Sequence, residues 1–260
     1  MDARGRPEHE EHPLNAEPSA QLTLLDLQAK DSALAQLHHR RTSLPEHARV
    51  AELQEKAGEL DGLRIEADTE VGDLTRAQSK ADAEVENVKA RRVRDEERLG
   101  SGAITNPKDL ESLQHELGAL ERRISTLEDE ELEVMERLEE AQQKLSSVNG
   151  DLDRVKAELD QVTAARDAAL EAIDAETATV TAERERVVAD VPAELLALYE
   201  KVGEQHGGLA AAALRARRCE GCRLEINGAD LREIAAKPDD EVLRCPECSR
   251  ILVRTAESGL

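Results

Sequence analysis

Residues 100–107 read Gly-Ser-Gly-Ala-Ile-Thr-Asn-Pro and separate two long segments with a periodic apolar pattern. Glycine and serine at the start of this stretch favour a turn over a continuous helix. Asn106 is placed to cap the next helix, and Pro107 suits the first helical position, where its missing N–H would have no partner anyway. We therefore predict that one helix ends near Leu99, the chain turns, and another helix begins at Pro107.

The segment after the turn carries a sustained heptad pattern. From Leu110 to Val187, twenty-three positions follow one another in alternating steps of three and four residues, and only four of them are polar. Such spacing places a narrow apolar stripe along one side of a helix. A seven-residue repeat held over this length predicts a left-handed coiled coil.

The segment before the turn has a matching pattern. Apolar residues recur at the same steps from Val50 to Val88, and an earlier helical pattern runs from Leu22 to Leu44. Pro45 separates the two patterns, because proline lacks a backbone donor and disfavours helix in the residue before it.

The segment lengths predict how these helices pair. Residues 46–99 match 107–160 in length, which places the helix before Pro45 opposite about 162–188. We therefore expect a mainly α-helical monomer whose residues 18–190 form a long antiparallel coiled-coil hairpin. A coiled coil between two chains is the alternative, and the capped turn makes it the weaker one.

The composition agrees with long helices. The chain of 260 residues has no Phe, no Trp and one Tyr, and 35% of its residues are charged. Its buried area must therefore come from Leu, Val, Ile and Ala. The net charge of −22 repels polyanions at long range, so nucleic-acid binding would need a locally basic patch. No apolar run of about 18 residues is present, so we expect no membrane span.

The N-terminal residues are polar, charged and rich in proline. Because they lack periodicity, we predict a disordered leader over residues 1–17. They also lack the apolar stretch of a secretory signal, so we expect a cytoplasmic protein. A reducing compartment favours metal binding over disulfide formation by its cysteines.

Four cysteines form two close pairs near the C-terminus, Cys219 with Cys222 and Cys245 with Cys248. Two such turns can present four thiolates to one tetrahedral Zn²⁺. A thioredoxin-like redox pair would need a βαβ context, and an iron–sulfur cluster suits this spacing less well. Four cysteine ligands leave no open position for catalysis, so we predict one structural zinc ion as the cofactor.

The cysteine pairs belong to a predicted C4 zinc ribbon over residues 215–260. A domain this small cannot rely on its core alone, so the metal should supply most of its folding free energy. Leu224–Ile226, Leu243 and Ile251–Val253 alternate like short β-strands around the zinc site. Gly221 is placed to supply a positive φ in the first cysteine turn.

Two segments flank or connect these strands. Residues 192–214 are predicted as a short helix, Ala193 to Gln205, followed by a connector. Asn227 to Ala236 is typical of an N-capped short helix that ends near Lys237-Pro238.

Two sets of basic residues are candidate partner-binding positions. One set lies beside the turn and the other around the cysteine pairs. The candidates are Arg91, Arg92, Arg94, Arg98, Lys108, Arg217, Arg218, Arg223, Arg244 and Arg250. Both sets also have a structural explanation, because cations stabilise helix C-termini and arginines solvate small surfaces. The ribbon has no aromatic side chain on which bases could stack, which weakens the case for single-strand recognition.

Three stretches together resemble a known family. They are the turn and restart from Asn106 to Leu117, the short helix from Pro192 to Tyr199, and the ribbon ending from Leu243 to Leu252. This arrangement is similar to the bacterial coiled-coil proteins that carry a C-terminal C4-type zinc ribbon. The resemblance implies a scaffold or regulator without enzymatic activity. Flagellated relatives are described as binding an alternative sigma factor of RNA polymerase and RNA.

The sequence therefore predicts a zinc-binding coiled-coil adaptor that binds protein partners through the turn or the ribbon. The alternative is a regulator that binds RNA or DNA through the ribbon arginines. An enzyme is not expected, because the sequence offers no phosphate-binding loop, no nucleophile with a nearby base and no open metal site. Neither a small-molecule substrate nor a membrane partner is expected.

Overall fold

The computed structural model describes residues 14–260, so residues 1–13 of the predicted leader lie outside the described residues. The chain divides into two compact units, one formed by residues 45–165 and the other by the segments before and after them. Along the chain, the elements are α1 (Pro18–Thr42), α2 (Pro45–Gly100), α3 (Pro107–Ala189), α4 (Ala193–Gln205), β1 (Ala211–Arg215), β2 (Arg218–Cys219), α5 (Gly228–Ala236), β3 (Leu243–Arg244) and β4 (Ile251–Val253).

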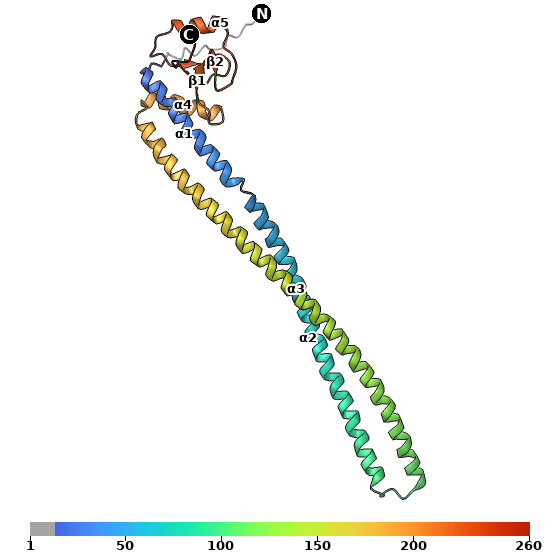
Figure 1. The fold of residues 1–260 in the computed structure, drawn as a ribbon. Helices are drawn as coiled ribbons and strands as arrows, with labels where there is room; N and C mark the ends of the chain where they lie inside the picture. The colour runs from blue at the N-terminus through green and yellow to red at the C-terminus, as the bar shows by residue number, and fades with distance from the viewer. Residues whose placement is uncertain (1–13) are drawn as a thin grey trace, which may run out of the picture. The chain divides into compact units, whose positions relative to one another are not determined.

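The unit of residues 45–165 is the part of the predicted hairpin (residues 18–190) that contains the turn, and in it α2 and the first part of α3 lie side by side (Figure 1). Its buried side chains all occupy predicted heptad positions. They are Val50, Leu53, Ala67, Leu74 and Val85 on α2, and Leu113, Ile124, Leu127, Leu138, Ala141, Leu152 and Val155 on α3. The side-chain oxygen of Asn106 accepts a hydrogen bond from Lys108 N (3.1 Å), which confirms the cap.

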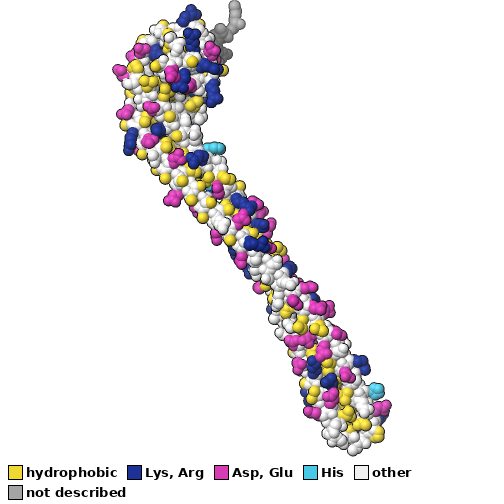
Figure 2. All heavy atoms as spheres, viewed as in Figure 1, with side chains coloured by type: hydrophobic (Ala, Val, Ile, Leu, Met, Phe, Trp, Pro, Cys, Tyr) yellow, Lys and Arg dark blue, Asp and Glu magenta, His cyan; other side chains and the backbone are white. Residues whose placement is uncertain are grey.

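Ion pairs between α2 and α3 follow the antiparallel register. Arg49 pairs with Glu158, Lys144 with Glu70 and Lys89 with Glu128. Both partners of each pair are substantially exposed, so each contributes only about 0–1 kcal/mol. The apolar stripe therefore stabilises the hairpin, and the charges mark its register. Figure 2 shows basic and acidic side chains interspersed along the helical surface.

The other unit begins with α1, which ends at Thr42, just before the predicted break at Pro45. Ion pairs join α1 to the C-terminal part of α3, Lys30 to Glu183 (2.6 Å) and Arg40 to Glu176 (3.1 Å). Both glutamates lie within residues 162–188, the segment predicted to face the helix before Pro45. Leu24 and Leu27 of α1 are fully buried.

The ribbon is a four-stranded sheet in the order β2-β1-β4-β3. β1 runs parallel to β4, with Ala211 opposite Ile251, and antiparallel to β2, with Leu214 opposite Cys219. β3 is antiparallel to β4. The edge strands β2 and β3 have only two residues each, and a cysteine turn begins at the end of each of them.

The sheet is buried on both faces, and successive residues of a strand point to opposite faces. On one face, Ala211, Ile251 and Val253 share a core with α1 and α4. On the other face, Ala212, Leu214 and Leu252 share a core with Cys219, Cys245 and Ile234 of α5. The sheet therefore lies between the helices and the cysteine cluster, and its side chains belong to both cores.

This arrangement corrects two sequence expectations. The boundary predicted between residues 214 and 215 falls inside β1, because the alanines of the supposed connector form the central strand. The predicted disordered leader is ordered from Leu14, where Val242 N donates to Leu14 O (2.9 Å) and Ala16 N donates to Asp240 O (2.7 Å). Leu14–Ala16 thus add backbone pairing at the β3 side of the ribbon.

Of the remaining predictions for this unit, the two short helices are confirmed and one strand is wrong. The short helix from Ala193 to Gln205 is α4, and Asn227 caps α5 by accepting hydrogen bonds from Ala229 N and Asp230 N, as predicted. The predicted strand at Leu224–Ile226 is absent from the described sheet, and only a single bridge joins Glu225 to Arg218. Within residues 14–260, no helix is long and apolar enough to span a membrane.

Candidate metal centre

The two cysteine turns have the same backbone geometry. In the first turn, Cys219 N donates to Leu224 O (3.1 Å), and Arg223 N donates to Cys219 O (2.7 Å). In the second, Cys245 N donates to Arg250 O (2.8 Å), and Ser249 N donates to Cys245 O (2.8 Å). Each turn therefore closes through the same two hydrogen bonds, which fixes both cysteines of the turn toward a common point.

The four sulfur atoms gather at that point. All lie within 4.8 Å of one another, with Cys219 Sγ to Cys248 Sγ and Cys222 Sγ to Cys245 Sγ each 4.0 Å. A tetrahedral zinc with Zn–S bonds of about 2.3 Å has its sulfurs about 3.8 Å apart. The cluster therefore fits one Zn²⁺ after a contraction of about 0.2 Å for the two 4.0 Å pairs and of at most about 1 Å for the others. The four cysteines of the C4 ribbon can hold one zinc ion.

Burial and hydrogen bonding act in opposite directions on these thiols. Burial raises the pKa of Cys219 and Cys245, although backbone N–H groups in each turn point at their sulfurs and oppose this effect. Burial also acts to raise the pKa of Cys248, but hydrogen bonding by the backbone and side chain of Arg250 and by the thiols of Cys245 and Cys222 outweighs it and lowers that pKa to about 7. A metal ion would replace the thiol protons and relieve the burial cost.

Gly221 has a different role from the one predicted. The left-handed residue of the first turn is Arg223 (φ 63°), and its counterpart in the second turn is Ser249 (φ 56°). Gly221 is needed for space, because a Cβ there would lie 3.0 Å from Ala212 Cβ and 3.1 Å from Arg250 Cδ. The sequence signal of a glycine between the cysteines was sound, but its physical reason is close packing.

A polar network joins the ribbon to the helices, and sequence reasoning missed it. Gln28 of α1 is buried, and its Oε1 accepts hydrogen bonds from Ala210 N (2.6 Å) and Ala211 N (3.1 Å) at the start of β1. Its Nε2 donates to Gly208 O (2.9 Å) and Ser32 Oγ (3.2 Å). One side chain thus satisfies backbone groups at the entry to the central strand.

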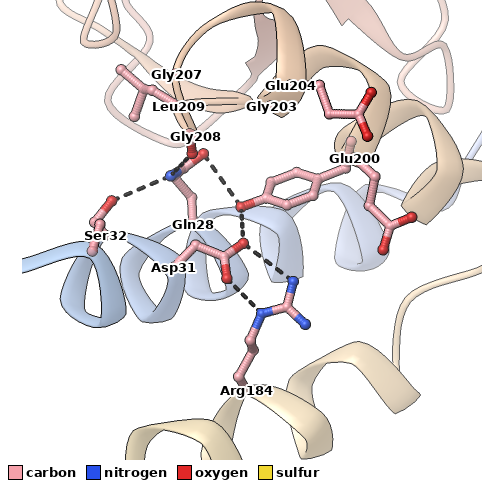
Figure 3. Close-up of a pocket in the computed structure, with 12 residues that line it drawn as sticks. Gln28, Asp31, Ser32, Arg184, Glu200, Gly203, Glu204, Gly207, Gly208 and Leu209 are labelled. Carbon is pink, nitrogen blue, oxygen red and sulfur yellow. Dashed lines mark hydrogen bonds and ion pairs between the residues drawn. The ribbon is translucent and has the colours of Figure 1, made fainter. Parts of the chain in front are cut away.

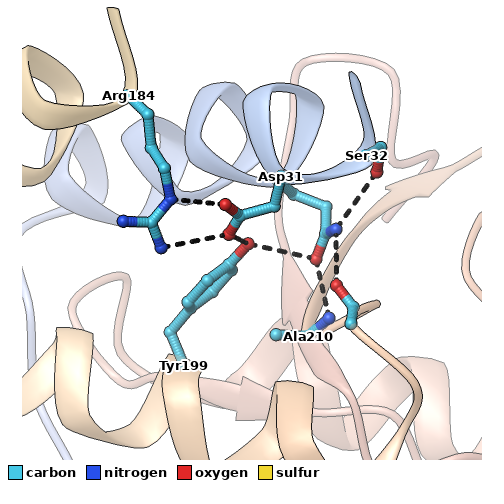
Figure 4. A network of polar contacts seen from close by, with 7 residues as sticks. Asp31, Ser32, Arg184, Tyr199 and Ala210 are labelled. Atoms are coloured by element: carbon cyan, nitrogen blue, oxygen red, sulfur yellow. Dashed lines mark hydrogen bonds and ion pairs between the residues drawn. The ribbon is translucent and has the colours of Figure 1, made fainter. Parts of the chain in front are cut away.

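Tyr199 extends this network to α3, as Figure 4 shows. Its hydroxyl donates to Asp31 Oδ2 (2.7 Å), and Asp31 forms an ion pair with Arg184. Burial and the Asp31 carboxylate raise the pKa of Tyr199, which keeps the phenol protonated as a donor. The only tyrosine of the chain therefore lies where α1, α3 and α4 meet.

An open hollow of about 530 Å³ lies beside this network (Figure 3). Asp31, Arg184 and Tyr199 line it, together with Glu200 and Glu204 of α4. The buried polar groups of the wall bond to one another, so they serve the joint between elements. We assign no ligand to the hollow.

The predicted basic tip is only partly available for binding. Arg91 forms ion pairs with Glu116 and Asp95, and Arg92 with Glu96. Within residues 14–260, no carboxylate pairs with the other three candidates, which are Arg94, Arg98 and Lys108. Two of the five cations predicted to bind a partner near the turn are therefore neutralised within the hairpin.

The ribbon candidates also divide into two groups. Arg250 Nε donates to Leu209 O (2.8 Å) and Arg217 Nε to Gly259 O (3.1 Å), so both serve internal contacts. Arg218 donates to Arg223 O (3.3 Å). Across the described part of the chain, Arg218, Arg223 and Arg244 have no carboxylate partner. These three remain the ribbon candidates for an anionic partner.

The fold and the sulfur cluster together define a coiled-coil hairpin protein with a C4 zinc ribbon. Comparison with protein families gives the same description. Residues 27–207 match the CT398-like coiled coil hairpin domain, and residues 218–252 match the C4-type zinc ribbon domain. The chain therefore belongs to the CT398-like coiled-coil hairpin family. Neither matched family is described as an enzyme.

Bacterial relatives share nearly the whole chain. "Uncharacterized protein Rv2229c" of Mycobacterium tuberculosis strain H37Rv is 38% identical over 245 residues, which cover 93% of this chain and 98% of that protein. A solved structure from Mycobacterium smegmatis is similar with a TM-score of 0.79 and 36% identity, over 93% of this chain and 100% of that one. CT398 from Chlamydia trachomatis is similar in fold, with a TM-score of 0.63 and 17% identity over 91% and 98% of the two chains.

Proposed function

We propose that this protein is a cytoplasmic, zinc-stabilised coiled-coil adaptor or regulator that holds macromolecular partners and catalyses no reaction. The observation that carries the proposal is the closed cluster of four cysteine sulfurs. Four thiolates complete a tetrahedral zinc site and leave no position for a substrate or a water molecule. The ion then serves to hold the ribbon sheet, whose other face packs on α1 and α4.

The binding surface we favour is the hairpin tip, defined as Val93, Arg94, Arg98, Lys108 and Leu110. Its three cations have no carboxylate partner among the described residues. Val93 and Leu110 are 45% and 36% exposed beside them. Arginine together with exposed apolar side chains is characteristic of protein interfaces. These features support a protein partner with an acidic, partly apolar surface.

The test uses the intact protein as bait in a cell lysate, with and without nuclease. A tip variant carries Arg94→Glu, Arg98→Glu and Lys108→Glu. We expect protein partners that survive nuclease and are lost from the tip variant. Partners that the tip variant retains in full would contradict the assignment of the tip, and turnover of generic ester, phosphoester or peptide substrates would contradict the absence of catalysis.

A control variant separates the tip from overall charge. It carries Arg122→Glu, Arg137→Glu and Lys156→Glu, three exposed cations of α3 that have no ion-pair partner among the described residues. This variant changes the net charge by the same amount and leaves the tip intact. We expect it to retain the partners.

A second candidate function is nucleic-acid binding through Arg218, Arg223 and Arg244. The favouring observation is that no carboxylate in the described part of the chain pairs with them. Binding of labelled single-stranded RNA should then weaken with salt, and reversing all three charges should lower the slope of log K against log salt by about 2. Absence of salt-dependent binding would exclude this candidate.

A further inference from the structure

Arg250 contacts three parts of the chain around the metal centre. It follows the second cysteine turn, and its carbonyl accepts the hydrogen bond from Cys245 N that closes that turn (2.8 Å). Its side-chain Cδ lies 3.1 Å from the position of a Cβ on Gly221, inside the first turn. Its Nε donates to Leu209 O (2.8 Å), in the link between α4 and β1.

The side chain of Arg250 therefore starts at the second cysteine turn, packs against the first turn at Gly221 and donates to Leu209 O. Arg250 lies two residues after Cys248, and the backbone carbonyl of Arg250 closes the turn that holds Cys245 and Cys248. Within the described residues, Arg250 forms no ion pair with a carboxylate. Its positive charge therefore lies beside the cysteine turns, where it is held by the carbonyl of Leu209 and by packing at Gly221.

The charge of a four-thiolate zinc site favours a cation beside it. Zn²⁺ with four thiolates carries a formal charge of −2, and partly buried charge is costly unless it is paired and hydrogen-bonded. A guanidinium stays charged at all physiological pH values and has several donors in a fixed fork, so one arginine can hold a backbone carbonyl and place its charge beside the thiolates. Arg244 precedes Cys245 directly but has no such contact among the described residues.

We infer that Arg250 is the positioning residue of the zinc site: it balances the charge of the four thiolates and couples metal retention to the attachment of the ribbon at Leu209. The inference rests on the zinc site and is independent of which surface binds a partner. It removes Arg250 from the candidate partner-binding residues. It also gives the metal a direct connection to the segment that leaves α4.

The test measures zinc affinity of the full chain by competition with a chelator. Arg250→Met keeps the length of the side chain and removes its charge and donors. Loss of an outer partner of a metal ligand costs about 10- to 100-fold in metal affinity, and we expect a loss in this range. Arg244→Met is the matched control and should change the affinity by less than about twofold, since it leaves the hydrogen bond from Arg250 to Leu209 O intact. Equal losses in both variants would overturn the inference.

A second variant keeps the test decisive if Arg250→Met does not fold. Arg250→Lys keeps the charge and removes the fork, and its folding can be followed by circular dichroism. In the Co²⁺-loaded protein, the sulfur-to-cobalt charge-transfer absorption should shift in Arg250→Lys and stay unchanged in Arg244→Met. Amide hydrogen exchange should also accelerate at Ala210 and Ala211. An unchanged spectrum with unchanged exchange would overturn the inference.

Discussion

Replacing Gln28 by alanine tests the joint between α1 and the ribbon most directly. The substitution removes the acceptor for two buried backbone groups, Ala210 N and Ala211 N. A buried donor left without a partner costs about 1–3 kcal/mol, so two of them cost about 2–6 kcal/mol. The hollow beside Gln28 is open and admits water. We therefore expect the lower part of this range, a loss of about 2–3 kcal/mol.

The assay benefits from the composition of the chain. Because there is no Trp and only one Tyr, tyrosine fluorescence reports on Tyr199 alone. Tyr199 lies in the same core as β1 and α4, so its signal follows unfolding of this unit and not of the hairpin of residues 45–165. Denaturant titration of the zinc-loaded protein then gives the change in the free energy of unfolding.

Gln36→Ala is the matched control, since Gln36 is an exposed residue of the same helix. We expect this control to change the free energy by no more than about 0.5 kcal/mol. If the two alanine variants unfold at the same denaturant concentration, the Gln28 contacts contribute nothing and the joint must be held by apolar packing alone.

Three further predictions concern the metal, the first cysteine turn and the hairpin. Chelation, or Cys245→Ser, should abolish binding of the one zinc ion per chain and should also change tyrosine fluorescence, because the sheet and the helices share a core; two ions per chain, or an unchanged signal, would refute this. Gly221→Ala should weaken zinc binding, since its Cβ would lie 3.0 Å from a β1 side chain, whereas Gly228→Ala meets nothing within 4 Å and should be neutral. A hydrogen bond to Asp82 raises the pKa of Glu131, so this contribution to stability is present at low pH and is lost as the pH rises through the folded pKa. Glu131→Gln should therefore raise the melting temperature at neutral pH, by an amount that disappears in acid; a constant difference at all pH values would contradict the sign.

The hairpin could be predicted because one strong pattern determines it. Every buried α2 side chain, from Val50 to Val85, lies on the predicted heptad stripe. Heptad spacing, the Asn106 cap and equal segment lengths all favour the same structure. When local and long-range signals agree in this way, the fold can be predicted from the sequence. The zinc site could be predicted for a similar reason, because two CxxC turns at this spacing form few other kinds of site.

The central strand β1 could not be predicted from local pattern. Its sequence begins with three alanines, and alanine has the highest helix propensity of all residues. The strand forms because β4 and β2 flank it, while its small side chains admit α1 on one face and Gly221 on the other. Tertiary contacts of this kind override propensity, and no single segment encodes them.

The Gln28 network was missed because buried polar residues look like surface residues in a sequence. Gln21 and Gln28 lie seven residues apart on α1, and both are buried. Gln21 Nε2 donates to Ala16 O (2.9 Å) and Asp239 O (3.2 Å), so it connects α1 to the ribbon as Gln28 does. The seven-residue spacing of two amides on the apolar side of a helix was the available signal.

The shared cores change how the zinc should be understood. A ribbon tethered by a connector would lose its own structure on metal loss and leave the helices unaffected. Here β1 and β4 carry apolar side chains to both faces, so disorder at the cysteines exposes Ala211, Ile251 and Val253 to water together with α1. Metal loss should therefore loosen the end of the helical scaffold to which the ribbon is attached. An adaptor built this way links the order of one of its ends to zinc, while the hairpin of residues 45–165 keeps its own stripe of buried side chains and does not depend on the metal.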